Sequence, residues 1–464
     1  MPADPTIPAP SRSPRLPAGV HARRPRFPLP DRPRLWGVAV SHYQVEGDDP
    51  CDWTEWESLG RTRGGPCGRA ADSWRLYEAD AELAASLGAN AFRFSVSWSR
   101  VERLRGVFDD FALSRYRSLV DRLAALGVEP VVTLFHYTHP AWFHAETPWT
   151  HTASVEAFAR FARVTAEALG PSARLWTVLN EPLVFVLGGF LDAQIPPGLS
   201  DGRSASRALG NLLRAHAAAA AAIRETTPGA AIGVAHNMMG FAPDRPRHPL
   251  DRWAARHAAR LYNGEVLSAF ATGRWDVLLP PLTRLRGRCD DLPRSLDFLG
   301  VNYYSRLHLR SPGRERAVAD FRYLDRTGLG LTDNGWEIVP DGLADALATA
   351  AAAGFPLLVT ENGLADASDA RRASFLEAHA AALERAAAGG AGVAGYLHWS
   401  LVDNFEWLDG WGPRFGLCGF DPTTFERRPR PSAEVFRRLG ERYLSGEGRP
   451  GAFTASRAAG LTSI

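Results

Sequence analysis

The chain has 464 residues, 45% of them hydrophobic, so it can bury a large core and is too long for a minimal domain. Its formal net charge is +2, and all 53 basic residues are arginines, because the sequence contains no lysine. A Schiff-base lysine and a P-loop lysine are therefore both absent, which excludes class I aldolases, pyridoxal phosphate enzymes and Walker-type nucleotide hydrolases.

The two ends of the chain differ in composition from its centre. Residues 1–33 are rich in proline and arginine, and we expect a disordered arm there, since such a composition cannot offset its ordering entropy. From residue 34 to residue 445, short apolar runs alternate with helical patterns without a linker-like gap. Residues 446–464 are predicted to be a flexible tail, so we expect one folded domain, residues 34–445, between two flexible ends.

The alternating segment predicts a parallel barrel. Its candidate strands are residues 35–40, 91–95, 130–135, 175–179, 231–235, 296–301, 357–360 and 393–397. Eight βα units indicate an α/β fold, a single (β/α)8 or TIM barrel. Helical patterns lie between the strands at residues 74–87, 116–126, 155–169 and 373–388, and the first three are followed directly by Gly88, Gly127 and Gly170. Long intervals after the first, fourth, fifth and sixth strands predict long βα loops that could form a pocket.

Two of these strands, the fourth and the seventh, end in a glutamate that adjoins an asparagine: Asn180-Glu181 and Glu361-Asn362. Parallel barrels carry their chemistry at the C-terminal ends of the strands, although a single glutamate there could also form a structural ion pair. Strands four and seven face each other across a barrel mouth, so both carboxylates could share one pocket. Cleaving a glycosidic bond with retention needs such a pair about 5–5.5 Å apart, one carboxylate to attack and a protonated partner to assist the leaving oxygen.

With these two motifs, six blocks occur in order along the chain: Trp36–Gly47, Phe92–Arg100, Asn180–Pro182, Phe298–Tyr304, Thr360–Gly363 and Trp399–Trp407. In these blocks, and over residues 35–438, the sequence resembles the family 1 glycoside hydrolases, which include β-glucosidases and β-galactosidases. The resemblance implies a retaining β-glycosidase that needs no cofactor and hydrolyses a terminal, unphosphorylated β-linked hexose, with β-D-glucosides as the expected substrates. Two alternatives stay open: a transglycosidase that uses the same glutamates with an acceptor alcohol, and an inactive sugar-binding barrel.

The resemblance also implies a role for each glutamate. Glu181 matches the general acid/base, and Glu361 matches the nucleophile that forms a glycosyl-enzyme intermediate. Arg93 and Tyr304 match positions beside the nucleophile, where attraction and hydrogen bonding favour the ionised carboxylate. Once Glu361 becomes a neutral ester, Glu181 is free of its repulsion and can serve as the base, so one pair of residues performs both half-reactions.

Seven further residues are expected to bind the substrate, with amide, imidazole and carboxyl groups on the sugar hydroxyls and indoles on the sugar faces. They are Gln44, His136, Asn180, Asn302, Trp399, Glu406 and Trp407. Glu406 also argues for an unphosphorylated sugar, because it would repel a dianionic phosphate. Each of these residue types has an ordinary structural role as well: the indoles could be core aromatics, Gln44 and Asn302 strand-end amides, and His136 a core histidine.

The sequence departs from the family pattern at Tyr137, where the family commonly has a tryptophan that lines the sugar pocket, so the sugar preference is open. His136, His139, His144 and His151 follow no helical ligand spacing, and we expect no metal site. The four cysteines, irregularly spaced, are expected to be reduced thiols. Residues 188–198 are apolar and proline-rich, which favours a hydrophobic aglycone.

The remaining expectations concern partners and location. The arginines are scattered among acidic residues, which argues against nucleic-acid binding. No apolar stretch reaches the length of a membrane span, and the N-terminal residues lack the apolar core of a signal peptide. We therefore expect a cytoplasmic protein whose partner is a small-molecule glycoside, with no nucleic-acid or membrane partner and with homo-oligomerisation left open.

Overall fold

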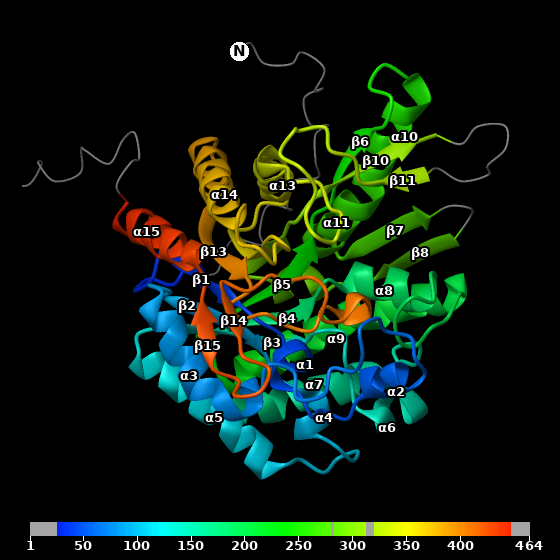
Figure 1. The fold of residues 1–464 in the computed structure, drawn as a ribbon. Helices are drawn as coiled ribbons and strands as arrows, with labels where there is room; N and C mark the ends of the chain where they lie inside the picture. The colour runs from blue at the N-terminus through cyan, green and yellow to red at the C-terminus, as the bar shows by residue number, and fades with distance from the viewer. Residues whose placement is uncertain (1–25, 280–282, 312–319, 447–464) are drawn as a thin grey trace, which may run out of the picture.

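Eight parallel strands close into a barrel in the computed structural model, which describes residues 26–279, 283–311 and 320–446 (Figure 1). The strands follow one another around the barrel in chain order. They are β1 (Leu35–Ala39), β2 (Ala91–Ser95), β3 (Glu129–Phe135), β4 (Leu175–Asn180), β5 (Ala231–Asn237), β9 (Phe298–Asn302), β12 (Leu357–Asn362) and β13 (Val393–Trp399). Each predicted strand corresponds to one of them, so the single (β/α)8 barrel is confirmed.

Helices cover the outside of the barrel between successive strands. They are α3 (Ser73–Ser86), α5 (Asp110–Ala125), α7 (Ala153–Leu169), α9 (Gly202–Thr226), α11 (Glu265–Thr272), α12 (Leu292–Ser295), α13 (Pro340–Ala351), α14 (Arg372–Ala388) and, after the last strand, α15 (Pro431–Ser445). Local signals explain several of their ends. The side chain of Asp109 accepts from the backbone N–H of Ala112 at the start of α5, and Gly127 follows the helix with φ 74°, a conformation that costs glycine little.

The connections between the barrel strands and these helices carry smaller elements, and the intervals predicted to be long, after the first, fourth, fifth and sixth strands, contain most of them. Before β5 these are α1 (His42–Glu46), α2 (Asp52–Ser58), α4 (Trp98–Val101), α6 (Ala141–Glu146), η1 (Gly170–Ser172) and α8 (Pro182–Phe190). Between β5 and β12 they are β6 (Gly240–Pro243), α10 (Pro249–Ala259), η2 (Arg260–Gly264), β7 (Arg274–Leu279), β8 (Thr283–Arg288), β10 (Arg306–Arg310) and β11 (Asp320–Arg322). After β13 come η3 (Trp407–Asp409), β14 (Cys418–Phe420) and β15 (Arg427–Pro429).

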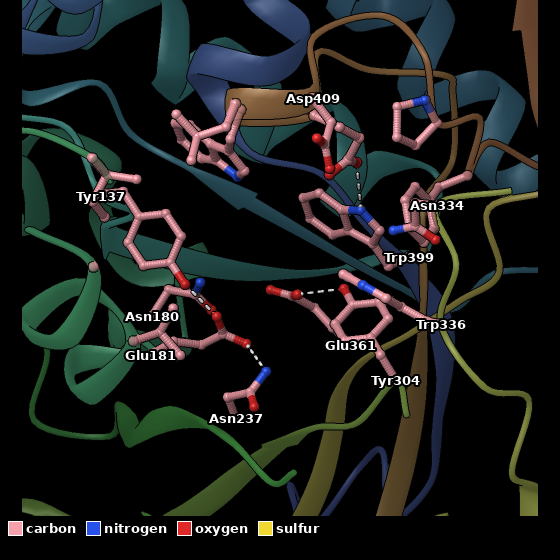
Figure 2. A pocket seen from close by; sticks show the side chains of 18 of the residues that line it. Tyr137, Asn180, Glu181, Asn237, Tyr304, Asn334, Trp336, Glu361, Trp399 and Asp409 are labelled. Atoms are coloured by element: carbon pink, nitrogen blue, oxygen red, sulfur yellow. Dashed lines mark hydrogen bonds between the residues drawn. The ribbon is translucent and has the colours of Figure 1, made fainter. Parts of the chain in front are cut away.

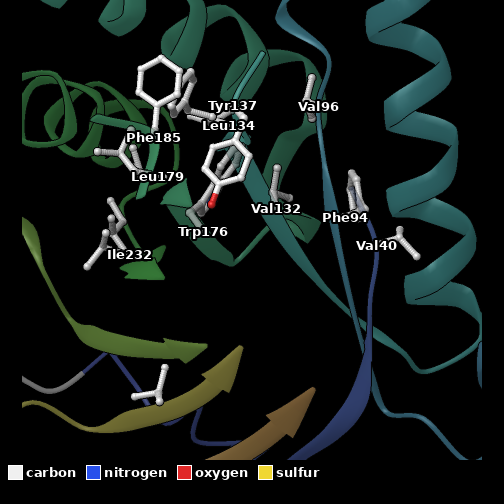
Figure 3. Packing of buried hydrophobic residues seen from close by; sticks show 14 of the residues in the cluster. Val40, Phe94, Val96, Val132, Leu134, Tyr137, Trp176, Leu179, Phe185 and Ile232 are labelled. Atoms are coloured by element: carbon white, nitrogen blue, oxygen red, sulfur yellow. The ribbon is translucent and has the colours of Figure 1, made fainter. Parts of the chain in front are cut away.

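The core has two layers because side chains of a strand alternate between its two faces. One layer lies between the strands and the helices, and Figure 3 shows part of it, with Leu134, Leu179 and Phe185 beside Tyr137. The other layer fills the barrel interior with residues from the starts of the strands, among them Leu175 and Phe298. This filled interior makes the C-terminal mouth the place where polar side chains can gather.

The end of the predicted disordered arm is part of this interior layer. Phe27 is 1% exposed and Leu29 is 4% exposed, and the Phe27 ring lies 4.6 Å from that of Phe298 between centroids. The prediction of disorder is therefore wrong for residues 26–33, because two apolar side chains in a proline-rich stretch are buried against the strand starts. Residues 1–25 of the arm and residues 447–464 of the tail lie outside the described residues.

Among the described residues, no helix is long and apolar enough to cross a membrane.

Candidate functional site

A cavity of about 380 Å³ opens among the loops at the C-terminal mouth of the barrel. Glu181 and Glu361 both line it, and Figure 2 shows their carboxylates pointing toward each other from opposite walls. Both are buried, at 7% and 4% exposure. The structure thus brings together the two glutamates that the sequence placed at the ends of the fourth and seventh strands.

Both glutamates follow an irregularity in the strand pairing. The register of β4 against β5 shifts between Thr177 and Asn180, and that of β12 against β9 shifts between Val359 and Glu361. Such shifts break the strict alternation of side chains and can re-aim a residue, so consecutive residues at these strand ends can face the mouth. Irregular pairing of this kind recurs beside active sites.

The backbone of Glu181 is itself unusual. It has φ 46° and ψ 58°, the left-handed region that residues other than glycine seldom adopt. Pro182 begins α8 directly after it and disfavours the right-handed helical conformation for the preceding residue. The backbone N–H of Glu181 donates to the carbonyl of Ala235 at 2.8 Å, which ties this turn to β5.

Glu361 is held by a cation and a phenol. Nη1 of Arg93 lies 2.6 Å from its Oε1, and the hydroxyl of Tyr304 donates to its Oε2 at 2.7 Å. The guanidinium is itself fixed, since Nε donates to Thr133 Oγ1 and Nη2 donates to Asn180 Oδ1. Burial raises the pKa of Glu361 to about 7 against the attraction of Arg93, while the charge of Glu181 adds to the rise and Tyr304 opposes it.

Glu181 is surrounded differently. The side-chain amides of Asn302 and Asn237 donate to its Oε1 at 2.8 and 3.0 Å, and the hydroxyl of Tyr137 donates to its Oε2. Among the described residues, these hydrogen-bond donors are all neutral, whereas Glu361 has an arginine. The two carboxylates therefore share one cavity but differ in the charge of their partners.

Six of the seven predicted substrate-binding residues line the cavity: Gln44, His136, Asn180, Trp399, Glu406 and Trp407. Trp399 Nε1 donates to Glu406 Oε1 at 3.1 Å, and burial raises the pKa of Glu406 to about 8. The Trp407 ring stacks on that of Tyr43, 5.8 Å between centroids and 7° between planes. Both indoles thus form cavity wall as well as packing against neighbours.

The imidazole of His136 is neutral and partly unsatisfied. Burial, followed by the charge of Arg93, holds its pKa well below the usual range. Its Nε2 lies 3.2 Å from Asn180 Nδ2, and because Asn180 Oδ1 accepts from Arg93, this Nδ2 is the donor and His136 Nε2 the acceptor. The buried Nδ1 then carries the hydrogen and has no partner in the described part of the chain, so a hydroxyl oxygen is a suitable acceptor for it.

Asn302 lies elsewhere than predicted. It is 0% exposed and is not among the residues that line the cavity. Its Oδ1 accepts from Thr360 Oγ1 at 2.6 Å, and its Nδ2 donates to Glu181 Oε1. The structure therefore places Asn302 behind Glu181, where it positions the carboxylate rather than facing a substrate.

Comparison with known proteins agrees with this geometry. The family model described as Glycosyl hydrolase family 1 matches residues 28–443. The chain belongs to this family. It is accordingly a glycoside hydrolase of the β-glucosidase and β-galactosidase type, built on the TIM barrel that the family shares.

Individual family 1 relatives cover almost the whole chain. A β-galactosidase of Pyrococcus woesei is 29% identical in an alignment of 492 positions that covers 87% of this chain and 96% of that protein. β-Glucosidase A of Thermotoga maritima is 32% identical in an alignment of 422 positions that covers 85% of this chain and 93% of that protein. The solved structure of a β-glycosidase from Pyrococcus horikoshii superposes with a TM-score of 0.79 at 33% identity, covering 92% of this chain and 99% of that one.

Sequence reasoning missed Asn237, which is the last residue of β5 and donates to Glu181. The predicted strand stopped at residue 235, two residues short. A signal was available, because Asn237 is an asparagine at the C-terminal end of a barrel strand, as Asn180 is. It also missed two aromatic residues that line the cavity, Tyr262 in η2 and Trp336 in the loop before α13.

No group of three or more His, Cys, Asp or Glu side chains that could hold a metal ion occurs within residues 26–279, 283–311 and 320–446. The histidines that the sequence analysis considered as metal ligands have different contacts. His136 faces the cavity, while His139 lies 3.5 Å from Asp52 and stacks on His144 at 6.1 Å between centroids. The four cysteines are all unpaired thiols.

Proposed function

We propose that this family 1 enzyme is a retaining β-glycosidase that hydrolyses a terminal, unphosphorylated β-linked hexose, with β-D-glucosides as its main substrates. The observation that carries the proposal is the pair Glu181 and Glu361, two buried carboxylates on opposite walls of one cavity. Glu361 has a cationic hydrogen-bond partner, whereas the partners of Glu181 are neutral. A carboxylate held by an arginine is suited to attack as an anion, and one held by neutral groups is suited to exchange a proton.

In the first half-reaction, Glu361 attacks the anomeric carbon while the bond from this carbon to the leaving oxygen breaks. Glu181 transfers its proton to that oxygen, which leaves as an alcohol. The products are a glycosyl ester on Glu361 and an ionised Glu181. Arg93 and Tyr304 orient Glu361 for the attack, because each holds a different carboxylate oxygen.

In the second half-reaction, water takes the place of the leaving alcohol. Glu181 removes a proton from this water as its oxygen attacks the anomeric carbon, and the ester bond to Glu361 breaks. Glu361 is neutral while it is an ester, so its repulsion of the Glu181 carboxylate is absent at this stage. Two displacements at one carbon give overall retention of configuration.

The polar and aromatic residues that line the cavity support recognition of an uncharged sugar. His136, with its unpartnered Nδ1–H, and Asn180 offer polar groups to hydroxyls, and Trp399 and Trp407 offer indole surfaces. Glu406 and Asp409 line the cavity, and no arginine does so among the described residues. A sugar 6-phosphate would therefore lack a cationic partner in the cavity.

Apolar and aromatic residues of the cavity support a hydrophobic leaving group. Val184 and Ile195, from α8 and the loop after it, line the cavity together with Tyr262 and Trp336. Apolar and aromatic walls favour an aryl aglycone over a second sugar. Much faster cleavage of short cello-oligosaccharides than of aryl β-glucosides would overturn this part of the proposal.

The proposal is tested by following the hydrolysis of 4-nitrophenyl β-D-glucoside by proton NMR. Retention predicts that β-glucose accumulates first and that the α-anomer appears only as mutarotation proceeds. Initial release of α-glucose would overturn the mechanism. A panel of 4-nitrophenyl glycosides that differ only in the sugar, with the glucoside, galactoside, fucoside and glucoside 6-phosphate, then tests the sugar preference.

A further inference from the structure

Tyr137 adopts a conformation that directs its phenol into the catalytic cavity. It lies two residues beyond β3 with φ 72°, the left-handed region that an aromatic residue seldom occupies. Its ring is 7% exposed and lies between Trp407, at 5.3 Å between centroids, and Phe185, at 6.3 Å with an angle of 14° between planes. Figure 2 shows the hydroxyl meeting the carboxylate of Glu181, and Figure 3 shows the ring beside Phe185.

The two oxygens of Glu181 are not equivalent. Oε1 accepts from both Asn302 and Asn237, and the orientation of these amides is fixed, because Thr360 donates to Asn302 Oδ1 and Tyr262 donates to Asn237 Oδ1. Two donors occupy the two lone pairs of Oε1. A transferable proton therefore belongs on Oε2, the oxygen that the hydroxyl of Tyr137 contacts.

The phenol remains a donor throughout the reaction. Burial, followed by the charge of Glu181, raises the pKa of Tyr137 well above its usual range, so the hydroxyl keeps its hydrogen. When Glu181 is protonated, Oε2 has a lone pair left for the phenol. When Glu181 is ionised, the same hydrogen bond becomes charge-assisted and stronger.

We propose that Tyr137 is a positioning residue that fixes Oε2 of Glu181 for proton transfer and stabilises the carboxylate that remains after the proton has left. The inference rests on the acid/base role proposed above for Glu181. The proton passes from Oε2 to the leaving oxygen in the first half-reaction and from water to Oε2 in the second, and Tyr137 keeps its own proton in both.

The test is the variant Tyr137→Phe, which removes the hydroxyl and keeps the ring. We expect the alkaline limb of kcat/KM to move to higher pH, because the ionised form of Glu181 loses a charge-assisted hydrogen bond. For glucosides with poor leaving groups, such as methyl β-D-glucoside, kcat/KM on the pH plateau below this limb should fall by up to about tenfold. For 2,4-dinitrophenyl β-D-glucoside, whose leaving group needs no proton, it should change less than twofold.

Tyr303→Phe is the matched control. Tyr303 is also buried, and its hydroxyl donates to the carbonyl of Val339 at 2.9 Å; neither residue lines the cavity, so loss of this hydroxyl should leave both the pH profile and the leaving-group dependence unchanged. The retained rate of Tyr137→Phe on the dinitrophenyl substrate shows that the variant is folded. An unmoved alkaline limb, or equal losses on both substrates, would overturn the role of Tyr137.

The variant Glu181→Ala separates this inference from the function on which it rests. If Glu181→Ala loses activity mainly on poor leaving groups and Tyr137→Phe shows no shift, only the role of Tyr137 is wrong. If Glu181→Ala loses activity equally on all leaving groups, the acid/base assignment itself is wrong, and the inference about Tyr137 ends with it.

Discussion

The two carboxylates of the cavity have the same chemistry and different neighbours. Glu361 meets the guanidinium of Arg93, which has no neutral form at working pH, whereas Glu181 meets two amides and a phenol. Both carboxylates are buried, so burial does not distinguish them. They differ in the charge of their hydrogen-bond partners, and this difference supports the division into nucleophile and acid/base.

The backbones of the two glutamates differ as well. Glu361 is a residue of β12 and is paired with Asn302 of β9, while Glu181 lies in a left-handed turn between β4 and α8. A nucleophile must be rigid relative to the anomeric carbon, and a strand supplies that rigidity. The turn places Glu181 in the cavity from a position beyond the end of β4.

Removing the nucleophile is expected to have the largest effect. Glu361→Ala should lower kcat by roughly 10⁵- to 10⁶-fold on every substrate, because no ester can form. The measurement is the steady-state rate on 4-nitrophenyl β-D-glucoside with and without azide. A small external anion should restore part of the rate and give the α-glucosyl azide, with inverted configuration.

The control for this variant is Glu434→Ala, which removes an exposed glutamate paired with Arg437 and should leave kcat unchanged. A β-configured azide product from Glu361→Ala would contradict the assignment of the nucleophile.

Removing the acid/base should have an effect that depends on the substrate. Glu181→Ala should lower kcat/KM by roughly 10³- to 10⁴-fold for alkyl glucosides, which need protonation of the leaving oxygen. Dinitrophenyl glucoside should lose less than tenfold in kcat/KM. The slope of log kcat/KM against the pKa of the leaving group reports the difference, and parallel slopes for the variant and the parent would contradict the role of Glu181.

Replacing Arg93 should lower kcat/KM in a pH-dependent way, because Arg93 favours the ionised form of Glu361. With its pKa near 7, the parent should lose kcat/KM as the pH falls through about 7, because Glu361 becomes protonated. Arg93 lowers this pKa, so Arg93→Gln should raise it and move the acidic limb to higher pH. We expect about a 100-fold loss of kcat/KM at pH 7.

Arg93→Lys keeps the positive charge and should move the acidic limb less than Arg93→Gln does. If both variants leave the limb where it is in the parent, the group that titrates there is not Glu361.

The smallest effect is expected for a substitution of Ile195, an apolar residue that lines the cavity. Ile195→Thr keeps the shape of a β-branched side chain and adds a hydroxyl to an apolar wall. It should lower kcat/KM about fivefold for a naphthyl β-glucoside, because the loss of apolar contact costs about 1 kcal/mol. Methyl β-glucoside, which does not reach this wall, should be unaffected.

Ile195→Val is the control, since it keeps the wall apolar and should change the naphthyl rate less than twofold. Equal losses on both glucosides for Ile195→Thr would show that the side chain acts on the sugar rather than on the aglycone.

Tertiary structure corrected the sequence-based picture at particular residues. Phe27 and Leu29 are buried although their surroundings in the chain are typical of a disordered arm, because the barrel interior is open to apolar side chains at the strand starts. Asn302 donates to Glu181 and accepts a hydrogen bond from Thr360 of the neighbouring strand, and no local pattern in the sequence predicts these contacts. Tyr137 was recognisable as a departure from the family, but its hydrogen bond to Glu181 was not.

The sequence by itself determined the barrel and the position of both glutamates. Apolar runs of strand length, helical periodicity and helix-ending glycines are local properties, and strands β4 and β12 had to bring Glu181 and Glu361 to the same edge of any parallel barrel. Only the tertiary structure decided the partners of these carboxylates. Strand register, left-handed backbone at Glu181 and Tyr137, and the loops that close the cavity place Arg93 on one carboxylate and neutral donors on the other, and these contacts join residues far apart in the chain.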